Sequence, residues 1–412
     1  MPSFTDLTHE EVLQKIHAEI DMPQDILDTI IDRYQSIGRW LDRDGSSISQ
    51  YDPKVAAQGS VRLGTANRPI GENDEYDVDL ICRLSLGKSE ITQQQLKAEI
   101  GEEIKAYAAA QSMNNEPEDK RRCWTMEYAD KRNFHVDILP CIPDAENYRK
   151  RLFDGGFKTL AERTNITEEA IAITDQKDPN YRSLSEDWPS SNPLGYAEWF
   201  KEKMAERLIA AKRALFESEA IYDSIEDIPD HKVKTTLQKS VQLLKRHRDY
   251  VFSDDGEHKP ISILITTLAA QAYSNESTLV DALAAVLEKL DTFIEDRDGI
   301  VWVPNPVNPA ENFADKWEEE PMKAKEFRRW LNLARRDFGE YINAMPPDRV
   351  PTALRDRLGE NLVEKVIGSV AKAMVPAVVS SVTERASART DGMVDRIRER
   401  GTGTQPWRDI EG

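Results

Sequence analysis

The chain has 412 residues, with 55 Lys and Arg against 74 Asp and Glu, which gives a formal net charge of −19 at pH 7. Binding of a long DNA or RNA duplex rests on a broad cationic face, so this charge argues against such a duplex as substrate or activator. A local basic pocket for one triphosphate remains compatible with it. The length favours two packed lobes over one small core.

No apolar run approaches the ~20 residues of a membrane span, and the N-terminus lacks the basic and apolar segments of a signal peptide. The three cysteines, Cys82, Cys123 and Cys141, are spaced too widely for a disulfide framework or a zinc ligand set. We therefore expect a cytoplasmic protein that does not associate with a membrane.

The spacing of apolar residues predicts N-terminal helices over residues 9–21 and 23–44. From residue 54 to residue 141 the pattern changes to period-two alternation, rich in β-branched and aromatic residues. This alternation predicts three strands, at 75–84, 121–129 and 133–142.

A helix over residues 89–111, capped by Ser89, is predicted between the first two strands. After residue 143 the chain is mostly helical, and the segment 259–274 is apolar on nearly all sides, which is typical of a buried helix. The remaining helical stretches are 194–222, 232–252, 277–296 and 323–345, with a Pro- and Asn-rich crossing at 301–317.

Two aspartates alternate in the first strand, in the segment "YDVDL". On a strand, Asp77 and Asp79 project to the same face about 7 Å apart, while Val78 and Leu80 point into the core. Such a pair can bind divalent ions, although alternating aspartates are more often a solvated face. An EF-hand is excluded because its glycine and its later glutamate are missing at the required offsets.

A third aspartate, Asp137, lies between Val136 and Ile138 in an apolar strand, where a carboxylate is costly without an ionic partner. Two partners fit equally well at this point: a divalent cation shared with the first aspartate pair, or an arginine. His135 shares the face of Asp137, and we interpret it as a satisfied structural histidine.

The segment "AAQGSVRLGT" ends a predicted short strand at Gly59, where the missing side chain lets backbone N–H groups approach a phosphate. The hydroxyl of Ser60 can donate to a terminal phosphate oxygen. Isolated Gly-Ser pairs are mostly turns, but this pair closely precedes the strand with the two aspartates. Arg62 and Arg68 follow it, and of two interpretations, a phosphate-facing pair or the charged rim of a loop, the rim is preferred.

Together, Gly59-Ser60, Asp77-Val78-Asp79 and Asp137 resemble the polymerase-β-type nucleotidyltransferase signature. The segments "QGSVRLGTANRP" and "SNPLGYAEWF" resemble the bacterial cGAS/DncV-like nucleotidyltransferases of CBASS anti-phage operons. The resemblance implies an α+β fold in which a polymerase-β-like palm is joined to a helical lobe like that of cGAS and the oligoadenylate synthases. The expected units are a palm with N-terminal helices at 1–165, a helical lobe at 166–345, a C-terminal helical region at 346–398 and a flexible tail at 399–412.

The resemblance also implies residue roles. Asp77 and Asp79 would bind two Mg²⁺ ions, with Mn²⁺ as a substitute, and Asp137 would complete the metal site and help activate the attacking ribose hydroxyl. Gly59 and Ser60 would hold the donor triphosphate. A lysine and a serine of the helical lobe would also contact the phosphates; here they are Lys245, with Lys239 as a second candidate, and Ser262, which could equally be a helix N-cap. In "SNPLGYAEWF", Tyr196 and Trp199 are interpreted as core residues.

The implied activity is synthesis of a cyclic di- or trinucleotide from NTPs such as ATP or GTP, with the product acting on an effector protein in anti-phage defence. An E1/E2-like ligase could join the C-terminal Gly412 to a target. Two rival functions stay open: a linear nucleotidyltransferase that extends RNA or makes oligoadenylate, and an inactive nucleotide-binding signalling module. The sequence does not define the bases, the linkage, the ring size, the activating signal or the oligomeric state.

Overall fold

The structure is a computed structural model that describes residues 7–71, 74–128, 134–218, 222, 224–340 and 345–374. The predicted tail at 399–412, Gly412 included, lies outside these residues, as does the predicted C-terminal region beyond residue 374.

A mixed sheet forms the palm, and within the described residues it has seven strands in the order β1-β2-β5-β4-β3, with β6 paired to β5 and β7 to β6. Strand β2 runs parallel to β5, whereas the other pairs are antiparallel. The strands are β1 Lys54–Ala57, β2 Tyr76–Arg83, β3 Glu118–Asp119, β4 Trp124–Tyr128, β5 Phe134–Pro143, β6 Ile171–Ile173 and β7 Ser190–Ser191. The three strands predicted from alternation are therefore confirmed as β2, β4 and β5.

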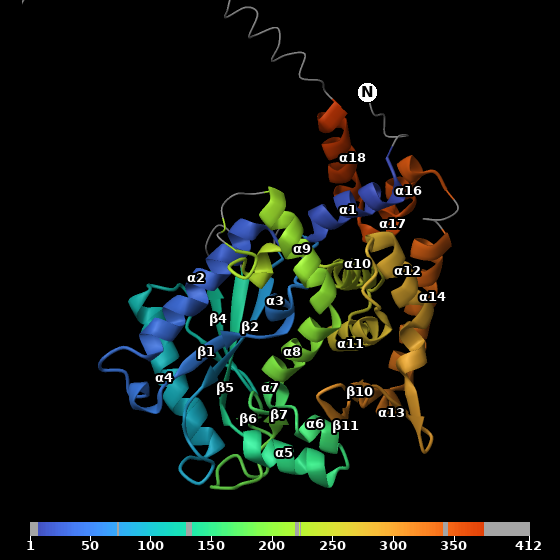
Figure 1. The fold of residues 1–412 in the computed structure, drawn as a ribbon. Helices are drawn as coiled ribbons and strands as arrows, with labels where there is room; N and C mark the ends of the chain where they lie inside the picture. The colour runs from blue at the N-terminus through green and yellow to red at the C-terminus, as the bar shows by residue number, and fades with distance from the viewer. Residues whose placement is uncertain are drawn as a thin grey trace, which may run out of the picture.

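Helices α2 (Gln24–Leu41) and α4 (Gln93–Ala110) cover one face of this sheet (Figure 1) and share its hydrophobic core. The predicted Ser89 cap of α4 is wrong, because the helix begins after Thr92. Thr92 forms a reciprocal capping box with Gln95, which satisfies two backbone donors at once. The other elements before the helical lobe are α1 His9–Ile20, η2 Ser49–Tyr51, α3 Gly59–Leu63, α5 Ala145–Asp154, α6 Lys158–Ala161 and α7 Thr164–Thr167.

The second lobe is helical and has its own core, in which the predicted apolar helix α11 (Ser262–Ala272) is largely buried. The stretch predicted as one long helix from residue 194 is divided at Met204 into two helices. The helices of this lobe are α8 Pro193–Lys203, α9 Ala205–Ser218, α10 Thr236–Val251, α12 Leu279–Lys289, α13 Lys316–Glu319 and α14 Pro321–Ala334, with η3 Asp230–Lys232, η4 Leu290–Phe293 and the π-helix η5 Arg335–Glu340.

The Pro- and Asn-rich crossing predicted at 301–317 folds into β-structure rather than an irregular loop. One short antiparallel hairpin, β10 Pro304–Asn305 with β11 Asn308–Asn312, lies within this segment, and a second, β8 Glu295–Arg297 with β9 Ile300–Trp302, leads into it. The side chain of Asn312 accepts from the backbone N–H groups of Val303 and Ala314 and donates to the carbonyl of Val301, so asparagine replaces main-chain pairing here.

The N-terminal helix α1 lies against the second lobe, and its apolar residues belong to that lobe's core. It also packs against α18 (Glu360–Met374), which follows η6 Pro347–Arg349, α16 Val350–Ala353 and α17 Arg355–Leu358 (Figure 1). The domain boundaries expected from the sequence stay a prediction.

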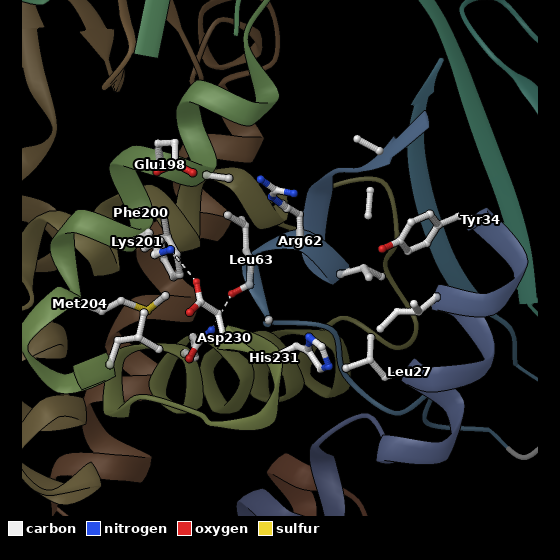
Figure 2. Close-up of a pocket in the computed structure, with 18 of the residues that line it drawn as sticks. Leu27, Tyr34, Arg62, Leu63, Glu198, Phe200, Lys201, Met204, Asp230 and His231 are labelled. Atoms are coloured by element: carbon white, nitrogen blue, oxygen red, sulfur yellow. Dashed lines mark hydrogen bonds and ion pairs between the residues drawn. The ribbon is translucent and has the colours of Figure 1, made fainter. Parts of the chain in front are cut away.

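A cavity of about 450 Å³ lies between α2 and α8, and residues of α3 form part of its wall (Figure 2). Its walls include Leu27 and Tyr34 of α2 and Phe200 of α8, and at one side Asp230 forms an ion pair with Lys201 at 2.6 Å. None of the three aspartates singled out by the sequence lines this cavity.

Candidate active site

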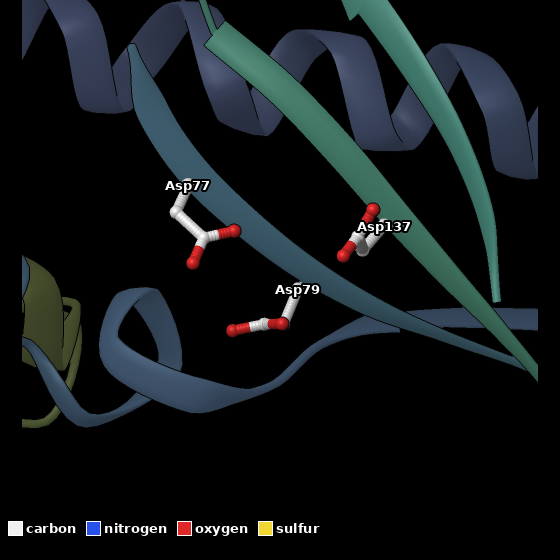
Figure 3. Close-up of side chains that lie close together, drawn as sticks. All are labelled: Asp77, Asp79 and Asp137. Carbon is white, nitrogen blue, oxygen red and sulfur yellow. The ribbon is translucent and has the colours of Figure 1, made fainter. Parts of the chain in front are cut away.

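The three predicted aspartates come together on two neighbouring strands (Figure 3). Asp77 and Asp79 project from β2, and Asp137 projects from β5 at the register position paired with Asp79. One carboxylate oxygen from each lies within 4.8 Å of the others. The intervening Val78 and Val136 are buried, which confirms the alternation predicted for both strands.

Asp137 is held by a hydroxyl and not by an arginine. Its Oδ1 accepts a hydrogen bond from Thr125 Oγ1, which lies opposite it on β4. In the part of the chain that the structure describes, no arginine forms an ion pair with Asp137. Of the two partners left open for this carboxylate, the arginine is therefore not seen, and the cation shared with the other two aspartates remains.

Burial and the crowding of the three carboxylates raise the pKa of Asp79. Burial, and then the charges of Asp77 and Asp137, raise the pKa of the Asp79 carboxyl to about 6. Three carboxylates this close repel one another, and a divalent cation between them relieves the repulsion while keeping them ionised. The arrangement fits a hard cation with oxygen ligands, such as Mg²⁺ or Mn²⁺.

His135 is a satisfied histidine, as interpreted from the sequence, but it lies inside the site. Its Nε2 is 3.1 Å from Asp77 Oδ1 and its Nδ1 is 3.3 Å from Glu75 Oε2. The hydrogen bond with Asp77 raises the pKa of His135 to about 9, and the same bond lowers the pKa of Asp77. His135 is therefore charged at neutral pH and offsets part of the negative charge of the three aspartates.

Gly59 is constrained by the aspartates themselves. It does not end a strand, as the sequence suggested: β1 stops at Ala57, and Gly59 begins the short helix α3 with a φ of +57°. A Cβ atom at this position would lie 2.3 Å from Asp79 Oδ2, so any side chain would displace that carboxylate. Glycine is needed here both for the left-handed backbone and for the space that Asp79 occupies.

A cleft of about 890 Å³ opens between the palm and the helical lobe, a volume typical of a ligand site. It brings together most of the residues predicted from the sequence, whereas Asp137 is not among its lining residues. Its lining carries basic and acidic side chains in equal number, and the basic ones could hold a polyphosphate locally although the whole chain is acidic. The predicted residues in its lining are Gly59, Ser60, Arg68, Asp77, Asp79, Lys245 and Ser262, and the further basic ones are Arg246, Arg248 and Lys259.

The two lysine candidates on α10 are separated by the structure. Lys245 is buried beside the cleft and donates from Nζ to the carbonyl of Thr65 at 2.9 Å. Burial, and then the nearby Arg248, lower the pKa of Lys245 to about 8. Lys239 instead donates to Gln14 on α1 at 2.8 Å and does not line the cleft.

Ser262 is not an N-cap, because α11 begins at Ser262 itself and Ile261 occupies the cap position. Its hydroxyl accepts a hydrogen bond from Arg248 Nη1 at 2.9 Å. Arg248 was missed in the sequence, where it lies within the basic run of α10 and nothing marks it as facing a cleft.

Arg68 lines the cleft and lies 3.8 Å from Glu19, while Arg62 and Tyr196 line another, smaller cavity on the other side of α3. Tyr196 and Trp199 are buried core residues, as predicted.

The part of the chain that carries the three aspartates is similar to a known family of enzyme domains. Residues 53–140 match the family model of the cyclic GMP-AMP synthase DncV-like nucleotidyltransferase domain, a stretch that contains all three aspartates and the Gly-Ser pair. The chain therefore contains a nucleotidyltransferase domain. More particularly, it carries the nucleotidyltransferase domain of the DncV-like family, which confirms the resemblance inferred from its motifs.

Two similar proteins extend the match over most of the chain. A c-di-GMP synthase of Roseivirga ehrenbergii is 28% identical over 326 residues, which is 78% of this chain and 77% of that protein. The cyclic dinucleotide synthase CdnG of Bradyrhizobium diazoefficiens is 22% identical over 382 residues, 86% of this chain and 85% of CdnG.

Solved structures agree on the fold. The structure of CdnG from Bradyrhizobium diazoefficiens in complex with GTP superposes with a TM-score of 0.63 at 20% identity, covering 87% of this chain and 97% of CdnG. The Vibrio cholerae cyclic AMP-GMP synthase DncV gives a TM-score of 0.51 at 12% identity, over 84% of this chain and 93% of DncV. The predicted two-lobed α+β fold is therefore confirmed. Among the described residues, no helix combines the length and apolar character of a membrane span.

The pKa of Asp79 predicts how cation binding depends on pH. At pH 7 the Asp79 carboxyl is mostly ionised and at pH 6 it is about half ionised, so at lower pH a bound cation must displace its proton. The affinity for Mn²⁺ should therefore fall about twofold between pH 7 and pH 6 and about fivefold between pH 6 and pH 5. His135, with a pKa of about 9, stays protonated across this range and does not obscure the effect.

Isothermal titration of the nucleotide-free protein with Mn²⁺ at pH 5, 6 and 7 measures this dependence. An Asp79→Asn variant is the control, since it should bind weakly with little change over the same range. An affinity of the wild-type protein that does not change between pH 5 and pH 7 would contradict the assignment.

Proposed function

We propose that this protein is a metal-dependent cyclic dinucleotide synthase that joins NTPs by successive nucleotidyl transfers. The observation that carries the proposal is the convergence of three carboxylates, the Gly59-Ser60 helix start and Lys245 around one cleft. The c-di-GMP synthase and CdnG, which match most of this chain, are both named as cyclic dinucleotide synthases, which supports cyclisation over linear extension.

The chemistry assigns a role to each group. Attack of a ribose hydroxyl on an α-phosphate places extra negative charge on the phosphoryl oxygens and releases pyrophosphate. Two Mg²⁺ ions held by Asp77, Asp79 and Asp137 would supply the charge that stabilises this state. Asp137, oriented by Thr125, would accept the proton of the attacking hydroxyl.

The donor triphosphate would lie along the basic side of the cleft. Ser60 would donate its hydroxyl to a phosphate oxygen, and the free backbone N–H groups at the start of α3 would do the same. Lys245 and Arg248 reach the cleft from α10, and Arg248 also holds Ser262. Because these groups come from both lobes, closing the lobes on the nucleotide would complete the phosphate site.

Several finer parts of this proposal rest on the family resemblance of the sequence. They are the choice of Mg²⁺ over Mn²⁺, the action of the product on an effector protein in anti-phage defence, and the conjugation of Gly412 by an E1/E2-like ligase. If Gly412 is conjugated, its deletion should abolish conjugates in cells that carry the operon and leave the synthesis of the product unchanged.

The direct test supplies the purified protein with Mg²⁺ and all four labelled NTPs, treats the products with phosphatase and reads them by mass spectrometry. A phosphatase-resistant product is expected from the wild-type protein. It should be lost in Asp77→Asn/Asp79→Asn and in Asp137→Asn, because each variant removes a carboxylate needed for the charge of the transition state. Phosphatase-sensitive oligomers would instead favour the linear nucleotidyltransferase, and a product that persists in the variants would exclude the triad as the site.

The two lysines of α10 provide a matched pair for the phosphate site. Lys245→Ala should lower kcat/KM for NTPs roughly 10- to 100-fold, since a charge-assisted hydrogen bond contributes about 1.5–3 kcal/mol. Lys239→Ala removes the same charge from the same helix but faces α1, so kcat/KM should stay within about twofold of wild type. Melting temperatures of both variants control for stability. Equal losses in the two variants would rule out a specific phosphate role for Lys245.

A further inference from the structure

A second cavity of about 300 Å³ adjoins the aspartates on the side away from the phosphate cleft. Gly59 and Asp79 line both cavities, so the metal site lies at their junction. A volume of about 300 Å³ is at the lower end for ligand sites and suits a nucleoside better than a whole triphosphate. A reaction that joins two nucleotides needs a second nucleotide beside the metal site, and this cavity adjoins that site.

One wall of this cavity is formed by the β10–β11 hairpin, which presents Glu311, and by Phe313, which directly follows it. The side chain of Asn305 is buried and donates from Nδ2 to Glu311 Oε2 at 2.7 Å, while its Oδ1 accepts from the backbone N–H of Val307 at 3.0 Å. Asn305 therefore holds the Glu311 carboxylate in one orientation relative to the hairpin.

The hairpin is in turn attached to the palm. The hydroxyl of Tyr148, on α5, donates to the carbonyl of Val307 at 2.6 Å from a buried position. This bond joins the element that presents Glu311 to the lobe that carries Asp79. A carboxylate fixed in this way can recognise a ligand with little loss of side-chain freedom.

Glu311 is exposed, and it forms no ion pair with any residue of the described ranges. A carboxylate has only acceptors, and its two oxygens have about four lone-pair positions, so it can take two parallel donors besides the hydrogen bond from Asn305. Guanine is the one common nucleobase that offers two adjacent donors, N1–H and the N2 amino group, on its base-pairing edge. Adenine and cytosine place an acceptor beside their single amino group, and uracil flanks its N3–H with two carbonyls, so each would turn a lone pair towards the carboxylate.

The remaining lining agrees with a purine nucleoside. Half-buried Phe313 supplies an aromatic surface, and the buried core residue Tyr196 packs against it with the ring centroids 6.3 Å apart and the planes at 70°. An aromatic face favours stacking of a base. Arg62, for which the described residues provide no ion pair, also lines the cavity, and its guanidinium can donate to the O6 and N7 acceptors of guanine.

From this geometry we propose that the cavity beside Asp79 is a nucleobase subsite that selects guanine through Glu311, with Asn305 as the residue that positions the carboxylate. The inference rests on the proposed function and deepens it, because it names GTP as a substrate. Glu311 reads the base and takes no part in the transfer chemistry.

The test is a competition between ATP and GTP at equal concentration, with the base composition of the products read by mass spectrometry. Glu311→Gln keeps the size of the side chain but turns one acceptor into a donor, so guanine incorporation relative to adenine should fall roughly 10- to 100-fold. The matched control is Glu295→Gln on the β8–β9 hairpin, where Glu295 pairs with Arg297 at 2.7 Å and faces neither cavity. This control should keep the wild-type ratio.

A binding measurement separates recognition from turnover and from folding defects of the variant. In saturation-transfer NMR on the wild-type protein, guanosine should bind and should not be displaced by equimolar adenosine; Glu311→Gln should lose this preference. Equal binding of the two nucleosides to the wild-type protein, or a guanine-to-adenine ratio that Glu311→Gln leaves unchanged, would overturn the inference. Failure of the proposed function looks different: the wild-type protein would form no product that depends on the three aspartates.

Discussion

The site depends above all on the hydrogen bonds by which helix α10 fixes the loop that follows α3. Along one side of α10, Gln238, Gln242, Lys245 and Arg246 each donate a side-chain hydrogen bond to a backbone carbonyl in the segment 63–68. Unpaired carbonyls in a buried loop would be costly, so these bonds satisfy the loop and join the two lobes at the same time. The Gly-Ser helix start, which leads directly into this loop, is thereby held next to the aspartates.

Within that frame, the chemistry follows from crowding of like charges. Parallel pairing of β2 with β5 sets Asp79 beside Asp137, and the missing side chain of Gly59 leaves the space into which the Asp79 carboxylate fits. The protein compensates this charge only in part, through the His135 imidazolium at Asp77 and the Thr125 hydroxyl at Asp137. The strands, the helix start and the electrostatics all favour a cation between the carboxylates and a polyphosphate in the cleft.

Much of this arrangement could be predicted from the sequence, because short local sequence patterns determine it. Period-two alternation placed Asp77, Asp79 and Asp137 on the wet faces of two strands, and the Gly-Ser pair before them indicated the phosphate site. What the patterns could not show is contact between distant segments. Only the fold reveals that Lys245 faces the cleft while Lys239, on the same helix, faces α1, or that Arg248 holds Ser262.

The errors have the same physical origin. Ser89 and Thr92 are both good caps, and the reciprocal bond to Gln95 decides between them. The Pro- and Asn-rich segment near residue 305 has no alternation to mark it as β-structure, because asparagine side chains provide its hydrogen bonds. Glu311 belongs to this segment, so a residue that faces the site was not apparent before the hairpin was seen.

The central claim is that the three aspartates form one cation site beside the phosphate cleft. Anomalous diffraction from crystals grown with Mn²⁺ and a non-hydrolysable GTP analogue tests it most directly. The account predicts anomalous peaks for the bound ions against oxygens of Asp77, Asp79 and Asp137, at roughly the 2.1 Å of a Mg²⁺–oxygen bond, with the triphosphate reaching them from the side of Ser60 and Lys245. Nucleotide bound in the cleft without a peak at these carboxylates would contradict it.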